Sequence, residues 1–394
     1  MLGDTAHGAH QPLAGLKVID LSQIYNGPYA TFLMATAGAH VVKVEPPAGE
    51  PLRRRGVVGG AALPFAMLNG NKDSVVIDLK TEEGLAALKA MVADADVMVE
   101  NFAPGTTKKL GIDAEVMQAL NPRLIYASST GFGVDGPYRT YPAMDLTVQA
   151  MSGVMSITGF PDRPPVKAGP ALCDFFAGIH LYGAITTALL DRERTGIARR
   201  VSVAMQDAVY ASLSSSLGMV WGSRDEENPP PPRTGNRHGG MAESPYNVYP
   251  CTDGWIAIIC VGEKQWQKLC NVMERPDLLT DPRFASLKDR VSVMDTVDEI
   301  VGGWTGARSK EEAFGKLMTG GVPCAPVRTL SEVMEDENMH ARGSLQYQDH
   351  PELGRIVVQH SPLRYEGAPL TPLEPSHELG ADTDRILAAL GLSR

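Results

Sequence analysis

The order of apolar segments along the first half of the chain predicts an α/β fold built on a parallel, Rossmann-like sheet. Two observations support this fold class: short runs rich in Val and Ile recur from residue 16 onward, and segments with helical character separate them. A third observation concerns the second half. Beyond a proline-rich stretch near residue 230, the pattern changes to that of a smaller α+β domain.

The first βαβ unit is expected between residues 16 and 44. Residues 16–21 (LKVIDL) predict a buried strand, Asn26-Gly27-Pro28 opens a helix, and residues 40–44 (HVVKV) predict the next strand. Thr81 is expected to cap a helix that ends near residue 93. Further strands are expected at 75–79, 96–100, 123–128 and 200–203, and helices at 145–151 and 204–217.

Residues 223–233 contain four consecutive prolines and predict an exposed, stiff connector between domains. Beyond it, Thr252-Asp253-Gly254 between two strand-like runs indicates a β-hairpin at 246–260. Helices are expected at 263–273 and 310–318. The C-terminal part is expected to add a helix, a strand at 355–359 and a last helix at 383–390.

Asp174 stands at the start of an apolar run, residues 175–190, which has no charged residue and predicts a largely buried helix. The simpler role for Asp174 is that of a helix cap, and the local sequence favours it. The alternative is a nucleophile, because a helix N-terminus keeps an aspartate ionised and a carboxylate can form covalent intermediates.

Composition restricts the possible partners. The formal net charge of −10 argues against nucleic acid or an anionic membrane as the main partner. The first ten residues lack the pattern of a signal peptide, and the apolar run after Asp174 is shorter than the ~20 residues of a membrane span. The sequence has five cysteines, an odd number without the spacing of a metal site: Cys173, Cys251, Cys260, Cys270 and Cys324. This favours reduced thiols in a cytoplasmic enzyme without a metal.

The segment Gly131-Phe132-Gly133-Val134-Asp135-Gly136 matches the dinucleotide-binding pattern GxGxxG, but Pro137 and Pro142 follow it. No helix can then begin at the third glycine to receive a pyrophosphate, so we expect a turn-rich loop and no nicotinamide cofactor. Walker A, HExxH and GxSxG motifs are absent from the sequence.

Two basic clusters, residues 53–55 and Lys108-Lys109, follow predicted strands. Either cluster is a solvated loop or it binds the phosphates of an anionic cofactor, since α/β sheets bind ligands at this edge. Residues 234–240 form a flexible loop after the linker, with His238 as a weak acid/base candidate.

Several long segments together resemble the class III CoA-transferase family (CaiB/BaiF), of the formyl-CoA transferase and carnitine CoA-transferase type, which also includes α-methylacyl-CoA racemases. The matching segments run in order from about Leu13 to the C-terminus: LAGLKVIDLSQIYNGPYATFLMATAGAHVVKVEPPAGEPLR, NGNKDSVVIDLKTEEG, ADVMVENFAPG, LNPRLIYASSTGFGVDGPY, GPALCDFFAGIH, TGIARRVSVAMQDA and ELGADTDRIL. The resemblance implies a large Rossmann-like domain built from both chain ends (1–220 and 331–394), a linker (221–240), an inserted small α+β domain (241–330) and an interlocked homodimer.

The resemblance also implies a reaction: CoA moves from an acyl-CoA donor to a small carboxylic acid through an aspartyl anhydride and an aspartyl-CoA thioester, with Asp174 as the nucleophile. Met144, Asp145, His238, Gly239 and Gly240 would lie near the substrate. The CoA site, including Arg53 of the first basic cluster, would comprise Tyr25, Asn26, Arg53, Ile77, Lys80, Asn101, Phe102, Ala103, Lys109 and Ala143.

Three departures from the family pattern matter. Related racemases carry a histidine where this chain has Met144, and a thioether cannot relay a proton. Lys109 replaces an arginine, which removes a bidentate phosphate contact. The loop 238–244 has two glycines followed by Met-Ala-Glu-Ser in place of a continuous glycine run. We therefore expect a transferase, with a 2-methylacyl-CoA racemase or epimerase and a non-catalytic CoA-binding protein as alternatives.

Overall fold

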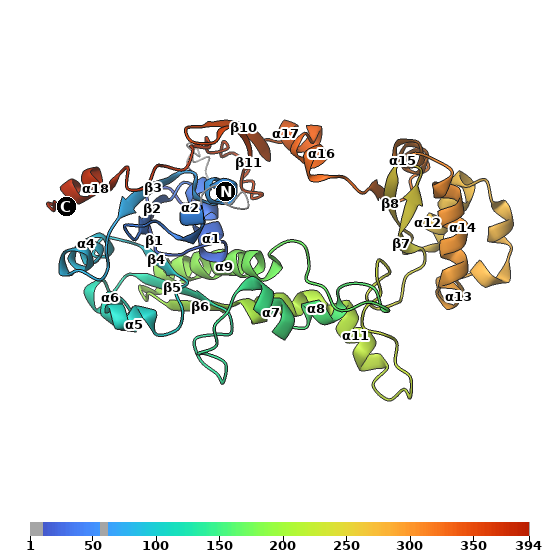
Figure 1. Ribbon diagram of the computed structural model, residues 1–394, viewed down its shortest axis with the longest axis horizontal. Helices are drawn as coiled ribbons and strands as arrows, with labels where there is room; N and C mark the ends of the chain where they lie inside the picture. Colours follow the sequence, from blue (N-terminus) through green and yellow to red (C-terminus); the bar gives the residue numbers. More distant parts are fainter. Residues whose placement is uncertain (1–10, 56–61, 394) are drawn as a thin grey trace, which may run out of the picture. The chain divides into compact units, whose positions relative to one another are not determined.

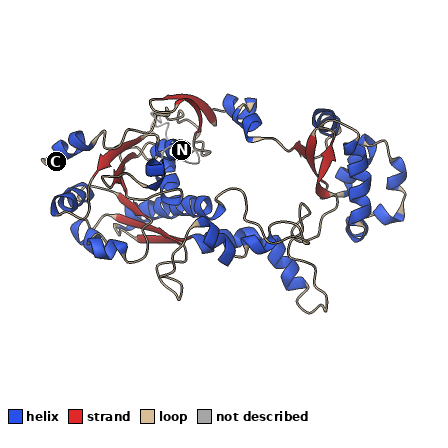
Figure 2. Cartoon of the chain, in the orientation of Figure 1, coloured by secondary structure: helices blue, strands red, loops and turns tan. Residues whose placement is uncertain are grey.

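The structure is a computed structural model that describes residues 11–55 and 62–393 (Figures 1 and 2). The chain forms two compact units. The first combines residues up to 148 with 170–209 and 334 onward, and the second combines 149–169 with 210–333. The segment 149–169, which was expected within the large domain, thus belongs to the second unit.

The first unit is built on a six-stranded sheet of order β3-β2-β1-β4-β5-β6, in which every neighbouring pair is parallel. The strand order reverses between β1 and β4, and such a switch point opens a crevice at the carboxyl ends of the strands. The predicted parallel sheet is confirmed. Its strands are β1 (Lys17–Asp20), β2 (His40–Glu45), β3 (Lys72–Val76), β4 (Val97–Glu100), β5 (Ile125–Thr130) and β6 (Arg200–Ala204).

Helices cover both faces of this sheet, because alternate strand residues point to opposite sides. Val18, Val97 and Ile125 pack against α1 (Asn26–Thr36) and α9 (Leu172–Thr195). The other face packs against α4 (Glu82–Val92), α6 (Ala114–Leu120) and α18 (Thr383–Ala389). α1 and α9 approach so closely that a Cβ on Gly178 would lie 2.6 Å from the carbonyl oxygen of Asn26.

Shorter elements complete the first unit. The start of α18 binds the edge strand β3: the Ser74 amide donates to Oδ2 of the cap residue Asp382 at 2.9 Å, and the Val76 amide donates to Thr383 Oγ1 at 3.0 Å. This pairing protects an otherwise open sheet edge. The other elements are α2 (Pro51–Arg55), α3 (Ala62–Asn69), α5 (Thr106–Leu110), α7 (Asp145–Met151, which runs on into the second unit), α10 (Met205–Tyr210), α17 (Glu337–Ala341), β10 (Leu345–His350) and β11 (Gly354–Gln359).

The second unit contains the predicted hairpin, with β7 (Tyr246–Cys251) antiparallel to β8 (Gly254–Ile259), and β9 (Cys324–Pro326) beside β8. Trp266, Phe284 and Val301 lie in its core. Its helices include α8 (Val154–Ile157), α11 (Ser214–Gly222), α12 (Glu263–Val272), α13 (Leu287–Ser292), α14 (Met294–Gly306) and α15 (Lys310–Thr319); α16 (Leu330–Met334) ends at the boundary.

Two elements differ from expectation. β3 begins and ends three residues earlier than predicted, so that Ile77, Asp78 and Leu79 leave the strand and line a cavity. The helix expected at 204–217 is broken into α10, a 3₁₀ turn at 211–213 and α11. Four serines between residues 212 and 216 explain the break, because serine competes for backbone hydrogen bonds inside helices.

α9 is a core helix. Among the described residues it is the one helix long and apolar enough to cross a membrane by length and composition, contrary to the expectation that its apolar run is too short. In the structure 44% of its apolar window is buried. The buried residues, including Leu181 and Ile185, pack within the first unit.

A buried ion pair joins the carboxyl end of β1 to the start of β3. The Lys72 Nζ lies 3.0 Å from Asp20 Oδ2, and both side chains are almost completely buried. Burial raises the pKa of Asp20, but the charges of Lys72 and Lys43 outweigh it and hold that pKa well below its ordinary value. Burial lowers the pKa of Lys72 to about 8 despite the attraction of Asp20. The pair therefore remains charged at neutral pH.

Replacing Lys72 by Met is expected to lower the free energy of unfolding by about 3–5 kcal/mol, because it leaves Asp20 as a buried charge without its main partner. Lys17→Met is the matched control in the same sheet, since Lys17 pairs with Asp94 at the surface; it should cost about 1 kcal/mol or less. Urea unfolding followed by circular dichroism measures both. Equal losses in the two variants would contradict the role given to the buried pair.

Candidate active site

A cavity of about 430 Å³ lies at the carboxyl ends of the strands in the first unit. Its walls come from the loops that follow β1, β4 and β5, from the segment 141–147, and from the first turn of α9. Asp145 and Asp174 both line it. The position is the crevice at which open α/β sheets bind ligands.

Asp174 is the third residue of α9 and is buried, with 9% of its surface exposed. It is not the helix cap that the local sequence favoured: the cap position belongs to Ala171, whose side chain makes no capping hydrogen bond. Within the described part of the chain, no donor hydrogen-bonds to the Asp174 carboxylate. Its oxygens are thus free to react with a molecule in the cavity.

Asp145 supplies the missing cap from another helix. Its Oδ1 accepts hydrogen bonds from the backbone amides of Cys173 at 2.9 Å and Asp174 at 3.4 Å. Asp145 can reach α9 because residues 141–144 press onto the end of β5, where a Cβ on Gly131 would lie only 2.0 Å from the Cβ of Ala143. Asp145 therefore fixes the first turn of α9, which carries Asp174.

Burial and a neighbouring carboxylate raise the pKa of the candidate nucleophile. Burial, and then the negative charge of Asp145, raise the pKa of Asp174 from 3.8 to about 7. Among the residues described as lining the cavity, none is lysine, arginine or histidine. Burial and the Asp145 charge thus oppose the ionisation that a helix N-terminus is expected to favour. The ionised form predominates only above about pH 7.

Asn101, Asn26 and Gln23 form a hydrogen-bonded wall of the cavity. The Asn101 amide group donates to Asn26 Oδ1 at 2.8 Å and to the carbonyl of Gln23 at 2.8 Å, and its Oδ1 accepts from the Gln23 amide at 2.8 Å. Ile24 in this wall has a φ of +67°, and its amide donates to the buried Glu50 at 3.1 Å. A β-branched residue in this conformation is strained, and such strain clusters at functional sites.

A second, smaller cavity of about 160 Å³ borders the first, and Gln23 and Phe102 line both. Ile77 and Lys80 line the smaller one. The adjoining cavities offer an elongated ligand a path from Lys80 to Asp174. Of the residues predicted to contact CoA, Asn26, Asn101, Phe102, Ala103 and Ala143 line the first cavity, and Tyr25 lies beside it with its ring stacked on Phe175 at 5.8 Å.

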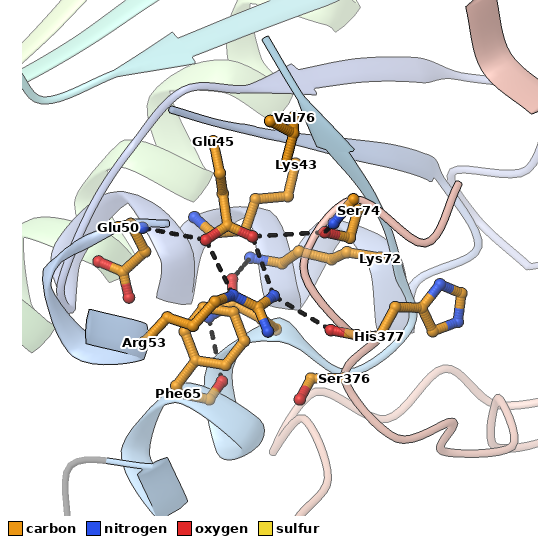
Figure 3. A network of polar contacts seen from close by, with 12 residues as sticks. Lys43, Glu45, Glu50, Arg53, Phe65, Lys72, Ser74, Val76, Ser376 and His377 are labelled. Carbon is orange, nitrogen blue, oxygen red and sulfur yellow. Dashed lines mark hydrogen bonds and ion pairs between the residues drawn. The ribbon is translucent and has the colours of Figure 1, made fainter. Parts of the chain in front are cut away.

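Arg53 does not join this site as predicted. Figure 3 shows its guanidinium between Glu45 and the ring of Phe65. It donates to both Glu45 oxygens, at 3.0 and 2.9 Å, and to the carbonyl of His377 at 3.0 Å, and it lies 4.0 Å from the Phe65 ring centre. Because Glu45 offsets its charge and binds its Nε and Nη2 donors, Arg53 has a structural role here and is a poor phosphate ligand.

Lys109 is exposed and lines none of these cavities, whereas Lys108 and Arg139 line a third cavity of about 450 Å³ that shares Phe102 and Ala103 with the first. Met144, half exposed, lines the first cavity next to Asp145.

His238, Gly239 and Gly240 belong to the second unit. There the His238 Nδ1 faces the amide of Gly240 at 3.3 Å, and the His238 ring packs on Tyr246. Their contact with substrate stays a prediction.

Sequence analysis missed Gln23, Ser129 and Met205, which also line the first cavity. One signal existed for Ser129: it lies near the carboxyl end of β5, where parallel sheets bind ligands.

Among the described residues, Asp73, His377 and Asp382 form a group with metal-binding side chains, but Arg385 binds both carboxylates at 2.7 and 2.8 Å. This arginine and the His377 ring account for the group as an ion-pair cluster.

Comparison with known proteins identifies the family. The pattern of CoA-transferase family III matches residues 13–383. The acetyl-CoA:oxalate CoA-transferase of Acetobacter aceti is 38% identical over 362 residues, with 90% of each chain covered. The succinate–glutarate CoA-transferase of Agrobacterium fabrum is 36% identical, with 96% of each chain covered.

Among solved structures, a CaiB/BaiF family protein from Brucella suis is similar with a TM-score of 0.83 and 34% identity, covering 97% of this chain and 100% of the other. The family pattern and the solved structure both match nearly the whole chain, including the parallel sheet and the cavity that contains Asp174. The chain therefore belongs to CoA-transferase family III.

Proposed function

We propose that this enzyme transfers CoA from an acyl-CoA thioester to a small carboxylic acid, with Asp174 as the covalent nucleophile. The observation that carries the proposal is the Asp174 carboxylate: it is buried in the first turn of α9, faces the cavity, and has no hydrogen-bond donor among the described residues. The names of two relatives, which act on oxalate and on succinate and glutarate, support small acids as substrates.

The proposed reaction has two symmetrical halves. The Asp174 carboxylate attacks the thioester carbonyl of the donor, a mixed anhydride forms, and CoA leaves as a thiolate. The thiolate then attacks the aspartyl carbonyl, which gives an aspartyl-CoA thioester and releases the donor acid. The acceptor carboxylate repeats these steps in reverse and leaves as its CoA thioester. The covalent route conserves the thioester energy that hydrolysis would lose.

The neighbourhood of Asp174 suits these steps. A carboxylate without hydrogen-bond donors and with a pKa of about 7 is more nucleophilic than a solvated one with a pKa of 3.8. Asp145 holds the first turn of α9 at the cavity, so that little reorientation is needed when the anhydride forms. We expect backbone amides near Asp174 and in the Gly239-Gly240 loop to stabilise the oxyanions, and that loop to exclude water.

The adjoining cavities suit CoA. The thioester would lie beside Asp174, the pantetheine arm would pass Asn101 and Phe102, and the nucleotide would lie toward Ile77 and Lys80. The surface residues Lys80, Lys108 and Arg139 offer positive charge for the phosphates.

Racemisation at the α-carbon is less well supported. It needs a second acid/base group opposite Asp174, and Met144 occupies the position at which related racemases were expected to carry histidine. Asp145 is the other carboxylate that lines this cavity, and its Oδ1 is committed to the amides of α9. A non-catalytic CoA-binding protein would not need a buried, unpaired carboxylate at this position.

Asp174→Asn is expected to reduce CoA transfer by about a thousandfold or more while CoA binding persists, because the amide cannot form the anhydride. Asp191→Asn is the matched control, since Asp191 lies in the same helix about 25 Å away. Acyl-CoA formation with a panel of donors and acceptor acids, read by mass spectrometry, measures transfer. Substantial turnover by the Asn variant would exclude Asp174 as the nucleophile, and α-deuterium exchange without an acceptor acid would favour a racemase.

Transfer should fall as the pH drops through about 7, because the carboxylate form of Asp174 is the reactive one. Below that pH, kcat/KM should fall about tenfold per pH unit.

Asp145→Asn keeps an oxygen that can cap α9 but removes the negative charge, so the inflection of the pH profile should move to lower pH. Asp145→Ala also removes the cap and should lower the plateau. A pH profile that stays unchanged in Asp145→Asn would contradict the coupling of the two carboxylates.

We also propose a cytoplasmic homodimer. The family resemblance implies two interlocked protomers, and the five cysteines, none of which forms a disulfide in the described structure, suit a reducing compartment. Light scattering of the purified protein should give about twice the chain mass of 42.2 kDa. A mass near that of one chain at micromolar concentration would exclude the dimer.

A further inference from the structure

Ser129 has a buried hydroxyl group that nothing in the described protein satisfies. The residue is 1% exposed, and its Oγ has no hydrogen-bond partner. It lines the cavity that contains Asp174 and Asp145. Buried hydroxyls are normally hydrogen-bonded because leaving them unpaired costs stability, so an orphan at a ligand cavity requires an explanation.

The geometry of β5 directs this hydroxyl toward α9. Alternate residues of a strand point to opposite faces, and Ile125 and Ala127 pack with Leu181 and Ile185 of α9. Ser129 continues that series, and the first turn of α9 carries Asp174. Ser128 points to the other face, where its hydroxyl donates to Glu100.

The neighbouring polar groups are already engaged. Thr130 Oγ1 accepts from the amide of Gly133 at 3.0 Å, Thr147 Oγ1 donates to the carbonyl of Met144 at 2.9 Å, and Asn26 Oδ1 accepts from Asn101. Besides the acceptor oxygens of Asp174, the Ser129 hydroxyl is the fully buried side-chain group without a partner among the described residues that line this cavity, and it is a donor. It is therefore the buried donor available to a bound molecule.

We infer that the Ser129 hydroxyl donates a hydrogen bond to a second oxygen function of the acyl group, so that the enzyme prefers dicarboxylic or hydroxylated acids to simple aliphatic acids of the same length. This inference rests on the proposed function, because it places the acyl group beside Asp174. Ile24, Met144 and Met205 make the rest of that cavity largely apolar. A single buried donor in such a surrounding selects for a polar atom at one place in the substrate.

The test compares succinate with butyrate, which have the same number of carbons, as acceptors from one acyl-CoA donor. The wild type is expected to prefer succinate in kcat/KM, and Ser129→Ala is expected to reduce that preference about tenfold. Ser129→Thr keeps a hydroxyl and should retain the preference. Ser128→Ala is the matched control in the same strand and should leave the ratio of the two acids unchanged.

A second readout does not depend on turnover. Ser129→Ala should raise the melting temperature of the ligand-free protein, since it removes an unpaired hydroxyl, but should weaken the stabilisation that succinate gives in the presence of CoA. An unchanged succinate-to-butyrate ratio in Ser129→Ala, or an equal loss for both acids, would overturn the inference while Asp174-dependent transfer stands. If the wild type transfers CoA to no acid in the panel, the proposed function fails, and the inference that rests on it fails with it.

Discussion

The hydrogen bonds from the first turn of α9 to Asp145 are the contact on which the rest of the site depends. α9 begins at Leu172 without a cap from its own sequence, and the Asp145 carboxylate, from the start of α7, accepts the amides of Cys173 and Asp174. A carboxylate at a helix N-terminus is favourable there. The same charge, in a cavity whose described lining has no cation, disfavours the ionisation of Asp174. Burial is the main cause of the raised pKa of Asp174, and the one contact with Asp145 both positions this nucleophile and adds to that rise.

The arrangement of the sheet brings Asp145 and the first turn of α9 together. The strand order reverses between β1 and β4, so the loops after β1, β4 and β5 converge at one edge. Gly131 lets the segment before α7 press onto β5, and Gly178 lets α1 approach α9. On the far side of the switch point, the buried pair Asp20–Lys72 ties the end of β1 to the start of β3, and Glu45–Arg53 ties the end of β2 to α2. Of the charged residues discussed here, Asp20 and Glu45 stabilise the fold through ion pairs, whereas Asp145 and Asp174 form the candidate active site.

Much of this organisation could be predicted from the sequence. Periodicity predicted the parallel sheet, α4 and its Thr81 cap, the long apolar helix α9 and the β7–β8 hairpin, because these elements follow local patterns. The roles of Arg53, Asp145 and Ser129 could not be predicted in this way. Arg53 binds Glu45 of the preceding strand together with His377 from the far end of the chain, Asp145 caps a helix 28 residues away, and Ser129 lacks a partner because no described neighbour offers its hydroxyl one. Such roles depend on tertiary contacts.

The central claim is that the Asp174 carboxylate exchanges an oxygen atom with the substrates in each cycle. If the acceptor acid carries heavy oxygen in its carboxylate, the acceptor anhydride breaks at the substrate carbonyl when CoA attacks it, and one labelled oxygen stays on Asp174. Peptide mass spectrometry of the enzyme after turnover measures this transfer. The account predicts heavy oxygen on the peptide that contains Asp174, confined to that side chain, and only when donor and acceptor are both present. Complete turnover without label on Asp174 would contradict it.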